Sequence, residues 1–174
     1  MGRIRFSVAM SLDGYIAGPR GEADWIVMDP DMDFGALVAQ FDTLLVGRRT
    51  FETMARVGRT TMPGMKTVVL STTLQQKDYP EVTVVSENTE QVVAALRRES
   101  TKDVWLFGGG ELFRRLLGAG LVDTVEVAIE PVILGDGVPL LPAPADRRKL
   151  QLTTHRVYRT GIIRAEYAVL KEAV

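Results

Sequence analysis

The sequence predicts an α/β fold built on a mixed, mostly parallel sheet that ends in an antiparallel hairpin near the C-terminus. Three observations carry this prediction. Strand-like and helical segments alternate from residue 4 to residue 118, and the segments after Asp123 have the pattern of strands with no helix between them. Glycines stand where buried strands pass into helices.

The elements follow one another regularly along the first two thirds of the chain. A strand over 4–11 leads into a long, glycine-rich loop over 12–25. A helix is predicted over 32–41, and Asp31 or Asp33 would cap it, because a side-chain oxygen there can accept a free N–H of the first turn. Further strands are predicted at 43–46, 65–70, 82–85 and 104–107, and helices at 48–57, 89–99 and after Gly110.

The last third of the chain contains strands only. They are predicted over 124–134, 151–158 and 162–170. A loop broken by prolines, LPAPADRR, precedes the second of them. The tripeptide RTG between the last two strands is typical of a hairpin turn, so these strands are expected to pair antiparallel at one edge of the sheet.

Length and composition favour a single cytoplasmic domain over residues 1–174 and argue against several classes of function. The 21 basic and 22 acidic residues leave a net charge of −1, so no surface for nucleic acid or for an anionic membrane is expected. Because the chain has no cysteine and one histidine, His155, disulfides, thiolate chemistry and a bound metal are not expected. No apolar run has the length of a signal peptide or a membrane span.

Three consecutive glycines, Gly108, Gly109 and Gly110, follow a predicted strand and begin a helix. A helix N-terminus presents free backbone N–H groups and a partial positive charge, which together can bind an anion such as a dinucleotide pyrophosphate. The dinucleotide-binding pattern G-x-G-x-x-G is not met, because Phe113 stands at its last position. The turn therefore predicts either an anion site or a tight connection without a ligand.

Two arginines at another connection favour the anion site. Arg48 and Arg49 follow Gly47 in the first turn of a predicted helix, where the helix dipole disfavours cations by about 0.3–1 kcal/mol each. A bound anion beside them would remove this cost, and solvated surface arginines are the alternative. Ser71 and Thr72 add hydroxyl groups at the end of another strand, the edge at which open α/β sheets bind ligands.

The order and spacing of five segments resemble the dihydrofolate reductase fold. These segments are VAMSLDGYIAG, ADW, LLVGRRTFETM, VVLST and LFGGGELF. More narrowly, the chain is similar to the reductase domain of the bacterial bifunctional riboflavin-biosynthesis deaminase-reductase and to its stand-alone relatives, from residue 5 to about residue 170. The resemblance implies a three-layer fold with helices on both faces of the sheet, NADPH as the cofactor, and a homodimer formed through the C-terminal strands.

The resemblance also implies which residues bind NADPH. Residues 47–50 match the segment that binds the cofactor's phosphates, where an arginine contacts the adenosine 2′-phosphate, and residues 71–72 match the hydroxyl pair that completes this site. Residues 108–111 match a turn that holds the pyrophosphate and contains a cis Gly-Gly bond. Residues 9 and 16 match positions around the nicotinamide. The implied set is Ala9, Ile16, Gly47, Arg48, Arg49, Thr50, Ser71, Thr72, Gly108, Gly109, Gly110 and Glu111.

The two catalytic candidates are Asp31 and Trp25. Reduction of a C=N or C=O bond needs a hydride from the cofactor and a proton from a side chain or from ordered water. Dihydrofolate reductases orient their substrate with a carboxylate near the start of the helix before the arginine segment, and Asp31 matches that position, although it also fits a helix cap. Asp13 and Asp24 are the alternatives. Trp25 matches a residue near the nicotinamide that is typical of the riboflavin branch.

Two departures from the riboflavin reductases leave the substrate open. Those enzymes carry an acidic residue before the glycine turn, where this chain has Phe107, and an Asp with Pro-x-Leu after the residue that Thr50 matches, where this chain has FETM. We expect an NADPH-dependent reductase of a small heterocyclic or carbonyl substrate, resembling dihydrofolate reductase and 5-amino-6-(5-phosphoribosylamino)uracil reductase. The alternatives are a non-catalytic nucleotide-binding module of the same fold and a domain without a ligand.

Overall fold

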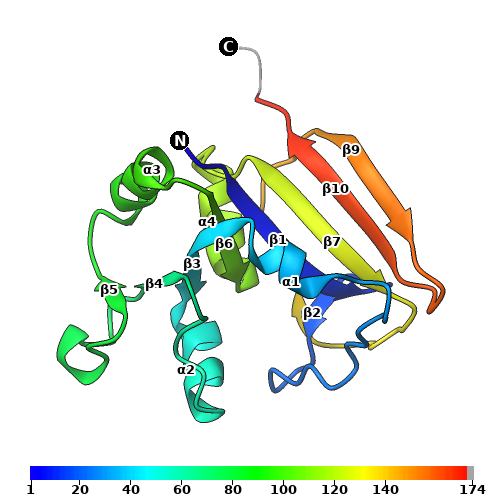
Figure 1. Cartoon of the computed structure of the whole chain (residues 1–174), viewed down its shortest axis with the longest axis horizontal. Helices are drawn as coiled ribbons and strands as arrows, with labels where there is room; N and C mark the ends of the chain where they lie inside the picture. The colour runs from blue at the N-terminus through cyan, green and yellow to red at the C-terminus, as the bar shows by residue number, and fades with distance from the viewer. Residues whose placement is uncertain (172–174) are drawn as a thin grey trace.

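The computed structural model describes residues 1–171, which form an eight-stranded sheet with helices packed against it (Figure 1). A separate two-stranded sheet joins β2 (Tyr15–Ala17) and β8 (Val138–Pro139). The strands of the main sheet are β1 (Ile4–Ser11), β3 (Phe41–Gly47), β4 (Lys66–Leu70), β5 (Thr83–Val85), β6 (Asp103–Gly108), β7 (Thr124–Glu130), β9 (Leu150–Val157) and β10 (Ile163–Val169). The helices are α1 (Phe34–Val38), α2 (Arg48–Arg56), α3 (Thr89–Glu99), α4 (Gly110–Gly118) and the 3-10 turn η1 (Gln76–Asp78).

The strands of the main sheet lie in the order β5-β4-β3-β6-β1-β7-β10-β9, with β5 and β9 at the two edges, as Figure 1 shows. Neighbouring strands from β5 to β7 run parallel, whereas β10 runs antiparallel to both β7 and β9. The prediction of a mostly parallel sheet with an antiparallel C-terminal hairpin is therefore confirmed.

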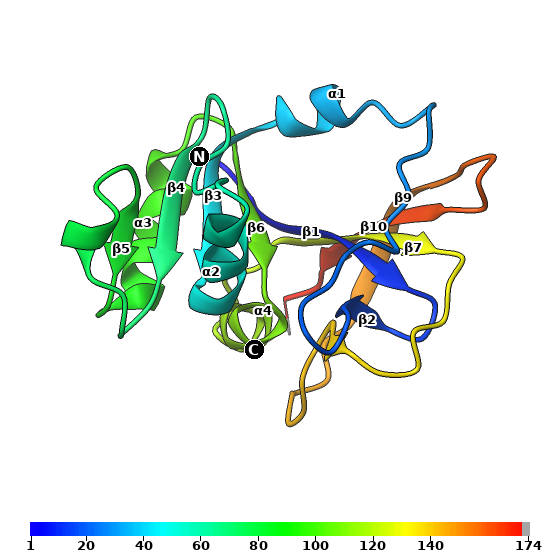
Figure 2. The same cartoon turned by 90° about the horizontal axis from the view of Figure 1, so that it is seen from below.

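Helices cover both faces of the sheet, so the predicted three-layer arrangement is also confirmed. Side chains of α3 and α4 share one core with β1, β4 and β7, and side chains of α1 and α2 share a second core with β3, β4 and β6. Successive residues of β3 show the alternation, because Leu45 packs in the first core while Leu44 and Val46 pack in the second. Figure 2 shows α1 and α4 on opposite sides of β1.

Most of the predicted elements are present with small shifts at their ends, and α3 has the predicted bounds. The helix predicted over 32–41 is shorter, because Asp33 caps it by accepting the Ala36 N–H at 2.8 Å and the chain re-enters the sheet at Phe41. The strand predicted over 124–134 ends at Glu130, before Pro131, whose nitrogen cannot join a ladder. The loop predicted over 12–25 contains β2, whose partner β8 lies more than a hundred residues away in the sequence.

No helix within residues 1–171 has the length and apolar character needed to cross a membrane.

Candidate functional site

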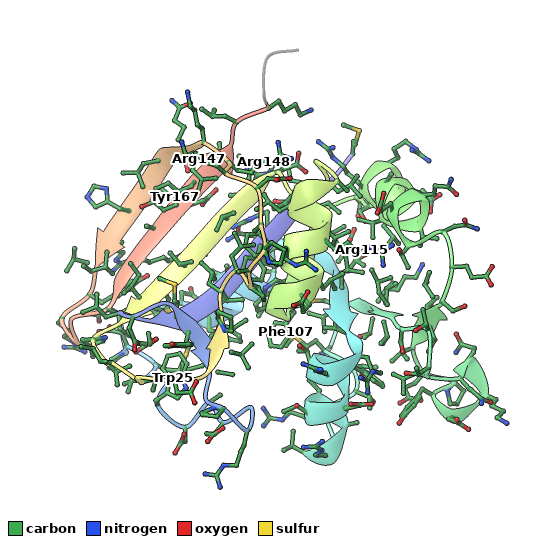
Figure 3. All side chains as sticks on the ribbon, turned by 180° about the vertical axis from the view of Figure 1, so that it is seen from behind. Trp25, Phe107, Arg115, Arg147, Arg148 and Tyr167 are labelled. Atoms are coloured by element: carbon green, nitrogen blue, oxygen red, sulfur yellow. The ribbon has the colours of Figure 1, made fainter. Side chains whose placement is uncertain are left out.

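A cavity of about 1170 Å³ opens along the carboxyl ends of the parallel strands β3, β4 and β6 and across β1 and β7. This is the edge at which open α/β sheets bind their ligands. The first turns of α2 and α4 form one part of its wall, and the loop between β2 and α1 forms another. In Figure 3, Phe107 lies between α4 and the part of this loop that carries Trp25.

The structure brings all of the sequence-predicted cofactor residues to this one cavity. They come from five separate segments of the chain. Four of these segments meet because β4, β3, β6 and β1 are neighbours in the main sheet, and the fifth, with Ile16, belongs to β2 of the small sheet. Their role in binding a cofactor stays a prediction. The residues concerned are Ala9, Ile16, Gly47, Arg48, Arg49, Thr50, Ser71, Thr72, Gly108, Gly109, Gly110 and Glu111.

Two helices point uncapped N-termini into the cavity. The N-cap of α2 is Gly47 and the N-cap of α4 is Gly109, and neither provides a side-chain hydrogen bond to the first turn. Both glycines line the cavity. The N–H groups of these two first turns therefore lack side-chain acceptors and can bind anionic groups of a ligand.

The three consecutive glycines differ in what a side chain would meet at each position. Gly108 has φ +149°, a backbone conformation that residues with a side chain rarely adopt. A Cβ on Gly110 would lie 2.5 Å from the carbonyl oxygen of Pro139, so this helix start packs directly against the backbone. A Cβ on Gly109 would meet only the Thr50 hydroxyl, at 3.3 Å. The peptide bond between Gly108 and Gly109 is cis, as the resemblance implies.

The two arginines after Gly47 differ in their surroundings. Both side chains are exposed and line the cavity, but the guanidinium of Arg48 pairs with Glu52 one turn later, at 3.1 Å. Arg49 has no ion-pair partner within the described part of the chain. Its charge is thus available to an anion in the cavity.

The two hydroxyl residues at the end of β4, Ser71 and Thr72, also differ in their surroundings. The buried Ser71 Oγ accepts the backbone N–H groups of Thr73, at 3.2 Å, and Leu74, at 3.0 Å, and so shapes the turn after the strand. The Ser71 hydroxyl can still donate its proton, and its oxygen lies 3.4 Å from the Thr73 hydroxyl oxygen. Thr72 is exposed at the cavity wall.

Neither predicted catalytic residue lines the cavity. The Asp31 side chain is exposed and lies 3.4 Å from the Arg159 guanidinium on the β9–β10 turn. The indole nitrogen of Trp25 donates to the backbone carbonyl of Glu22 at 3.2 Å. The two alternatives, Asp24 and Asp13, do not line the cavity either. Asp24 is exposed, and Asp13 accepts from the Ser11 hydroxyl and from two backbone N–H groups in the turn that follows β1.

At the β7 end of the cavity, an apolar wall faces a group of charged side chains. Trp105 links this wall together: its ring centroid lies 5.2 Å from that of Phe107 and 6.2 Å from that of Phe34. The wall and the charged group together are called the β7 end below. Its residues are Val27, Met28, Met32, Phe34, Trp105, Phe107, Glu126, Glu130 and Arg164.

Glu126 is buried and fully paired. One carboxylate oxygen accepts from Arg5 at 2.7 Å, and the other accepts from the Arg164 Nε at 2.7 Å. Arg5 is itself buried and reaches Asp103 and Gln40 with its other nitrogen. Two guanidinium groups therefore hold this carboxylate through charge-assisted hydrogen bonds.

Glu130 is equally buried but has no cationic partner within residues 1–171. Its carboxyl group accepts a single hydrogen bond, from the Val27 backbone N–H at 3.4 Å. Burial raises the pKa of the Glu130 carboxyl above its ordinary value, and the weak bond from Val27 offsets this only in part. A raised pKa in a cavity is typical of groups that exchange protons with a ligand.

Glu130→Gln is expected to stabilise the protein increasingly as the pH rises. The folded wild type binds more protons at Glu130 than the unfolded chain does between the ordinary and the raised pKa, so its free energy of unfolding falls with rising pH across this window. The variant lacks this loss and should match the wild type only below the ordinary pKa of glutamate. Urea unfolding across this range measures the difference, and a constant difference would contradict a raised pKa.

The residues that sequence reasoning missed lie mainly at the β7 end and beside α3. Glu126 and Glu130 stand four residues apart in the strand TVEVAIE, with only apolar residues between them, and charged residues inside such a strand are the signal that could have found them. Arg115 also lines the cavity; it donates to the Thr89 hydroxyl and lies 3.6 Å from Glu90. Within residues 1–171, no three His, Asp or Glu side chains are grouped so as to hold a metal ion.

Comparison with known proteins agrees with this geometry. The family model of the RibD C-terminal domain matches residues 3–164. The uncharacterized protein YyaP of Bacillus subtilis is 33% identical over 95% of this chain and 94% of its own length.

Two solved structures have similar folds. A protein of Shewanella sp. PV-4 named for riboflavin biosynthesis superposes with a TM-score of 0.83 at 26% identity, over 98% of this chain and all of that chain. Dihydrofolate reductase from Enterococcus faecalis, solved with NADP(H), superposes with a TM-score of 0.72 at 19% identity, over 97% of both chains.

Proposed function

The chain belongs to the family of the RibD C-terminal domain, and from this we propose that it is a single-domain, NADPH-dependent reductase that transfers a hydride to a small heterocyclic or carbonyl substrate. One observation carries the proposal: a single cavity unites the residues expected to bind the cofactor with two uncapped helix N-termini and a buried carboxyl group. The E. faecalis dihydrofolate reductase that shares the fold was solved with NADP(H).

The residues present fit such a cofactor. The first turn of α4 after Gly109 would hold the pyrophosphate through backbone N–H groups, because no side chain occupies them. Arg49 and the hydroxyls of Ser71 and Thr72 would hold the adenosine 2′-phosphate. Ala9 would lie beside the nicotinamide, next to Ala128 in the sheet, where small side chains leave room for a flat ring.

Bound NADPH would supply the hydride, and the chain's own residues would supply position and a proton. The apolar wall at the β7 end, including Phe107, would exclude water from the acceptor and hold a planar molecule by its faces. Met28 and Val27 line the cavity although half of each side chain is exposed, which is expected of a surface that a ligand covers.

NADPH binding is the first test. We expect NADPH at 100 times its Kd to add about 2.7 kcal/mol to the free energy of unfolding, measured as a thermal shift. No shift at millimolar NADPH would contradict the proposal. Binding without oxidation of NADPH by any carbonyl or pterin acceptor would favour the non-catalytic module instead.

We further propose a homodimer formed through β9. Every residue of this edge strand is exposed, among them Leu150, Leu152 and Val157, and an uncovered apolar edge invites pairing with another chain. Light scattering at micromolar concentration is expected to give the mass of a dimer, and Leu152→Glu should give a monomer. Val57→Glu, at an equally exposed position after α2, is the matched control and should remain dimeric. A monomeric wild type would contradict the dimer.

A further inference from the structure

The proposed reduction needs a proton as well as a hydride, and the inference about the source of this proton rests on the proposed function. Within the described residues, the titratable side chains that line the cavity are three carboxyl groups and four arginines. Arginine does not release a proton in proteins. The acid must therefore be one of the carboxyl groups of Glu111, Glu126 and Glu130, or water.

Two of the three carboxyl groups already pair with arginines. Glu111 is in the first turn of α4, exposed, and pairs with Arg114 at 2.9 Å. Glu126 is held between Arg5 and Arg164, so protonating it would break two charge-assisted hydrogen bonds. Among the three, Glu130 alone is buried without a cation in the part of the chain that the structure describes, and it is therefore the carboxyl group that can carry a proton into the reaction.

The position of Glu130 suits proton delivery. It is the last residue of β7 and lies beside Ser11 in the sheet, two residues beyond the pair Ala9 and Ala128 where the nicotinamide is expected. Its only hydrogen bond comes from Val27, in the loop that forms the opposite wall. The carboxyl group thus stands between the sheet and the apolar wall, within the space for the acceptor.

The other charged groups on the elements around Glu130 are already engaged. Asp13 accepts three hydrogen bonds in the turn after β1, and Asp29 accepts from the Thr160 hydroxyl at 2.7 Å and from two backbone N–H groups. Arg164, from β10, faces Glu126. None of these groups pairs with Glu130.

The charged side chains at the β7 end also indicate the charge of the acceptor. Arg164 is the only cation at the β7 end, and its charge is matched by Glu126. An acceptor that carries a phosphate would find no unpaired cation among these residues. The aromatic side chains of Phe34, Trp105 and Phe107 suit a flat, uncharged molecule.

We propose that Glu130 is the catalytic acid of this site and that it protonates an uncharged, planar acceptor. The bond reduced is C=N or C=O. The carbon receives the hydride that NADPH supplies, the Glu130 O–H bond breaks as its proton moves to the nitrogen or oxygen, and NADP⁺ and a Glu130 carboxylate remain. Water then returns a proton to Glu130.

The experiment uses the full chain with NADPH and four acceptors: the uncharged dihydrobiopterin, isatin and pyridine carboxaldehyde, and the phosphate-bearing 5-amino-6-(5-phosphoribosylamino)uracil. We expect NADPH oxidation with at least one uncharged acceptor and none with the phosphate-bearing one. With the active acceptor, Glu130→Gln should lower kcat by about 100-fold or more and leave its KM and the Kd of NADPH within about twofold. The wild-type kcat should fall as the pH rises through the pKa of Glu130.

Glu166→Gln, on the neighbouring strand β10 and outside the cavity, is the matched control and should retain the wild-type kcat. A second readout needs no acceptor: in protein labelled with ¹³C at the glutamate carboxyl carbons, the signal that disappears in Glu130→Gln should titrate above the ordinary range of glutamate. The titration itself is measured in the wild type, and the variant serves only to assign the signal.

Three results would overturn the proposal while leaving the proposed function intact, since NADPH would still bind. They are an unchanged kcat in Glu130→Gln, preferred turnover of the phosphate-bearing acceptor, and a Glu130 signal that titrates in the ordinary range. Failure of NADPH to bind would instead overturn the proposed function, and this proposal with it.

Discussion

Arg49→Gln is expected to weaken NADPH binding by about tenfold or more while changing NADH binding by less than about twofold. NADPH carries a 2′-phosphate that NADH lacks, and a charge-assisted hydrogen bond to it contributes about 1.5–3 kcal/mol. Arg49 is the cation at the start of α2 that has no partner among residues 1–171. The wild type should accordingly prefer NADPH over NADH by about 10–100-fold or more.

Substitutions of two other arginines of α2 show whether the effect of Arg49→Gln depends on its position or only on the lost charge. Arg48 already pairs with Glu52 at 3.1 Å, so we expect Arg48→Gln to weaken NADPH less than Arg49→Gln does. Arg56→Gln removes an equal charge from the last turn of α2, away from the cavity, and should change neither affinity. Isothermal titration with both nucleotides measures these differences. Equal losses for NADPH and NADH would show that the arginines do not contact the 2′-phosphate.

Gly109→Ala is expected to reduce NADPH affinity by about 100-fold or more, equal to about 2.7 kcal/mol, with a small effect on folding. Its Cβ would lie 3.3 Å from the Thr50 hydroxyl, a conflict that a small shift of this side chain relieves. The same methyl group would stand at the N-cap of α4, where the pyrophosphate must approach the backbone. Titration calorimetry and thermal unfolding of the variant measure the two effects separately.

Two other glycines on α4 provide the controls. Gly110→Ala places a Cβ 2.5 Å from the Pro139 carbonyl oxygen, so it should lower the free energy of unfolding by about 1–3 kcal/mol or more. Gly118→Ala meets no atom within 4 Å and should stabilise the last turn by up to about 1 kcal/mol without affecting NADPH. If Gly109→Ala binds NADPH as the wild type does, the pyrophosphate does not lie at this turn.

The common place of the predicted cofactor residues in one cavity could be foreseen because their sequence signals are local. At β3 and β6 the strand ends in glycine and a helix begins, so a few adjacent residues, such as Gly47 with Arg48 and Arg49, predict both the backbone turn and an anion site. The parallel order of the sheet then brings these ends together, because parallel strands present their carboxyl ends at one edge.

The β7 end was not predictable in the same way. Asp31 matches a family position by counting along the chain, but the loop before α1 is tied to the β9–β10 turn, where Arg159 lies 3.4 Å from it and where Thr160 binds Asp29. The direction of a loop side chain depends on which distant segment the loop packs against. The residues next to Asp31 in the sequence do not indicate which segment this is.

Glu126 and Glu130 show most clearly what the sequence determines and what only the tertiary structure decides. Their alternation within TVEVAIE places both side chains on one face of β7, and this follows from the chain alone, because successive side chains of a strand point to opposite faces. Their different hydrogen-bond partners do not follow from it. Arg5 and Arg164 reach Glu126 from β1 and β10, whereas Glu130 meets only a backbone N–H of the loop. The ionisation of a buried carboxyl group depends on the cations within a few ångströms of it, and the packing of distant strands decides which cations these are.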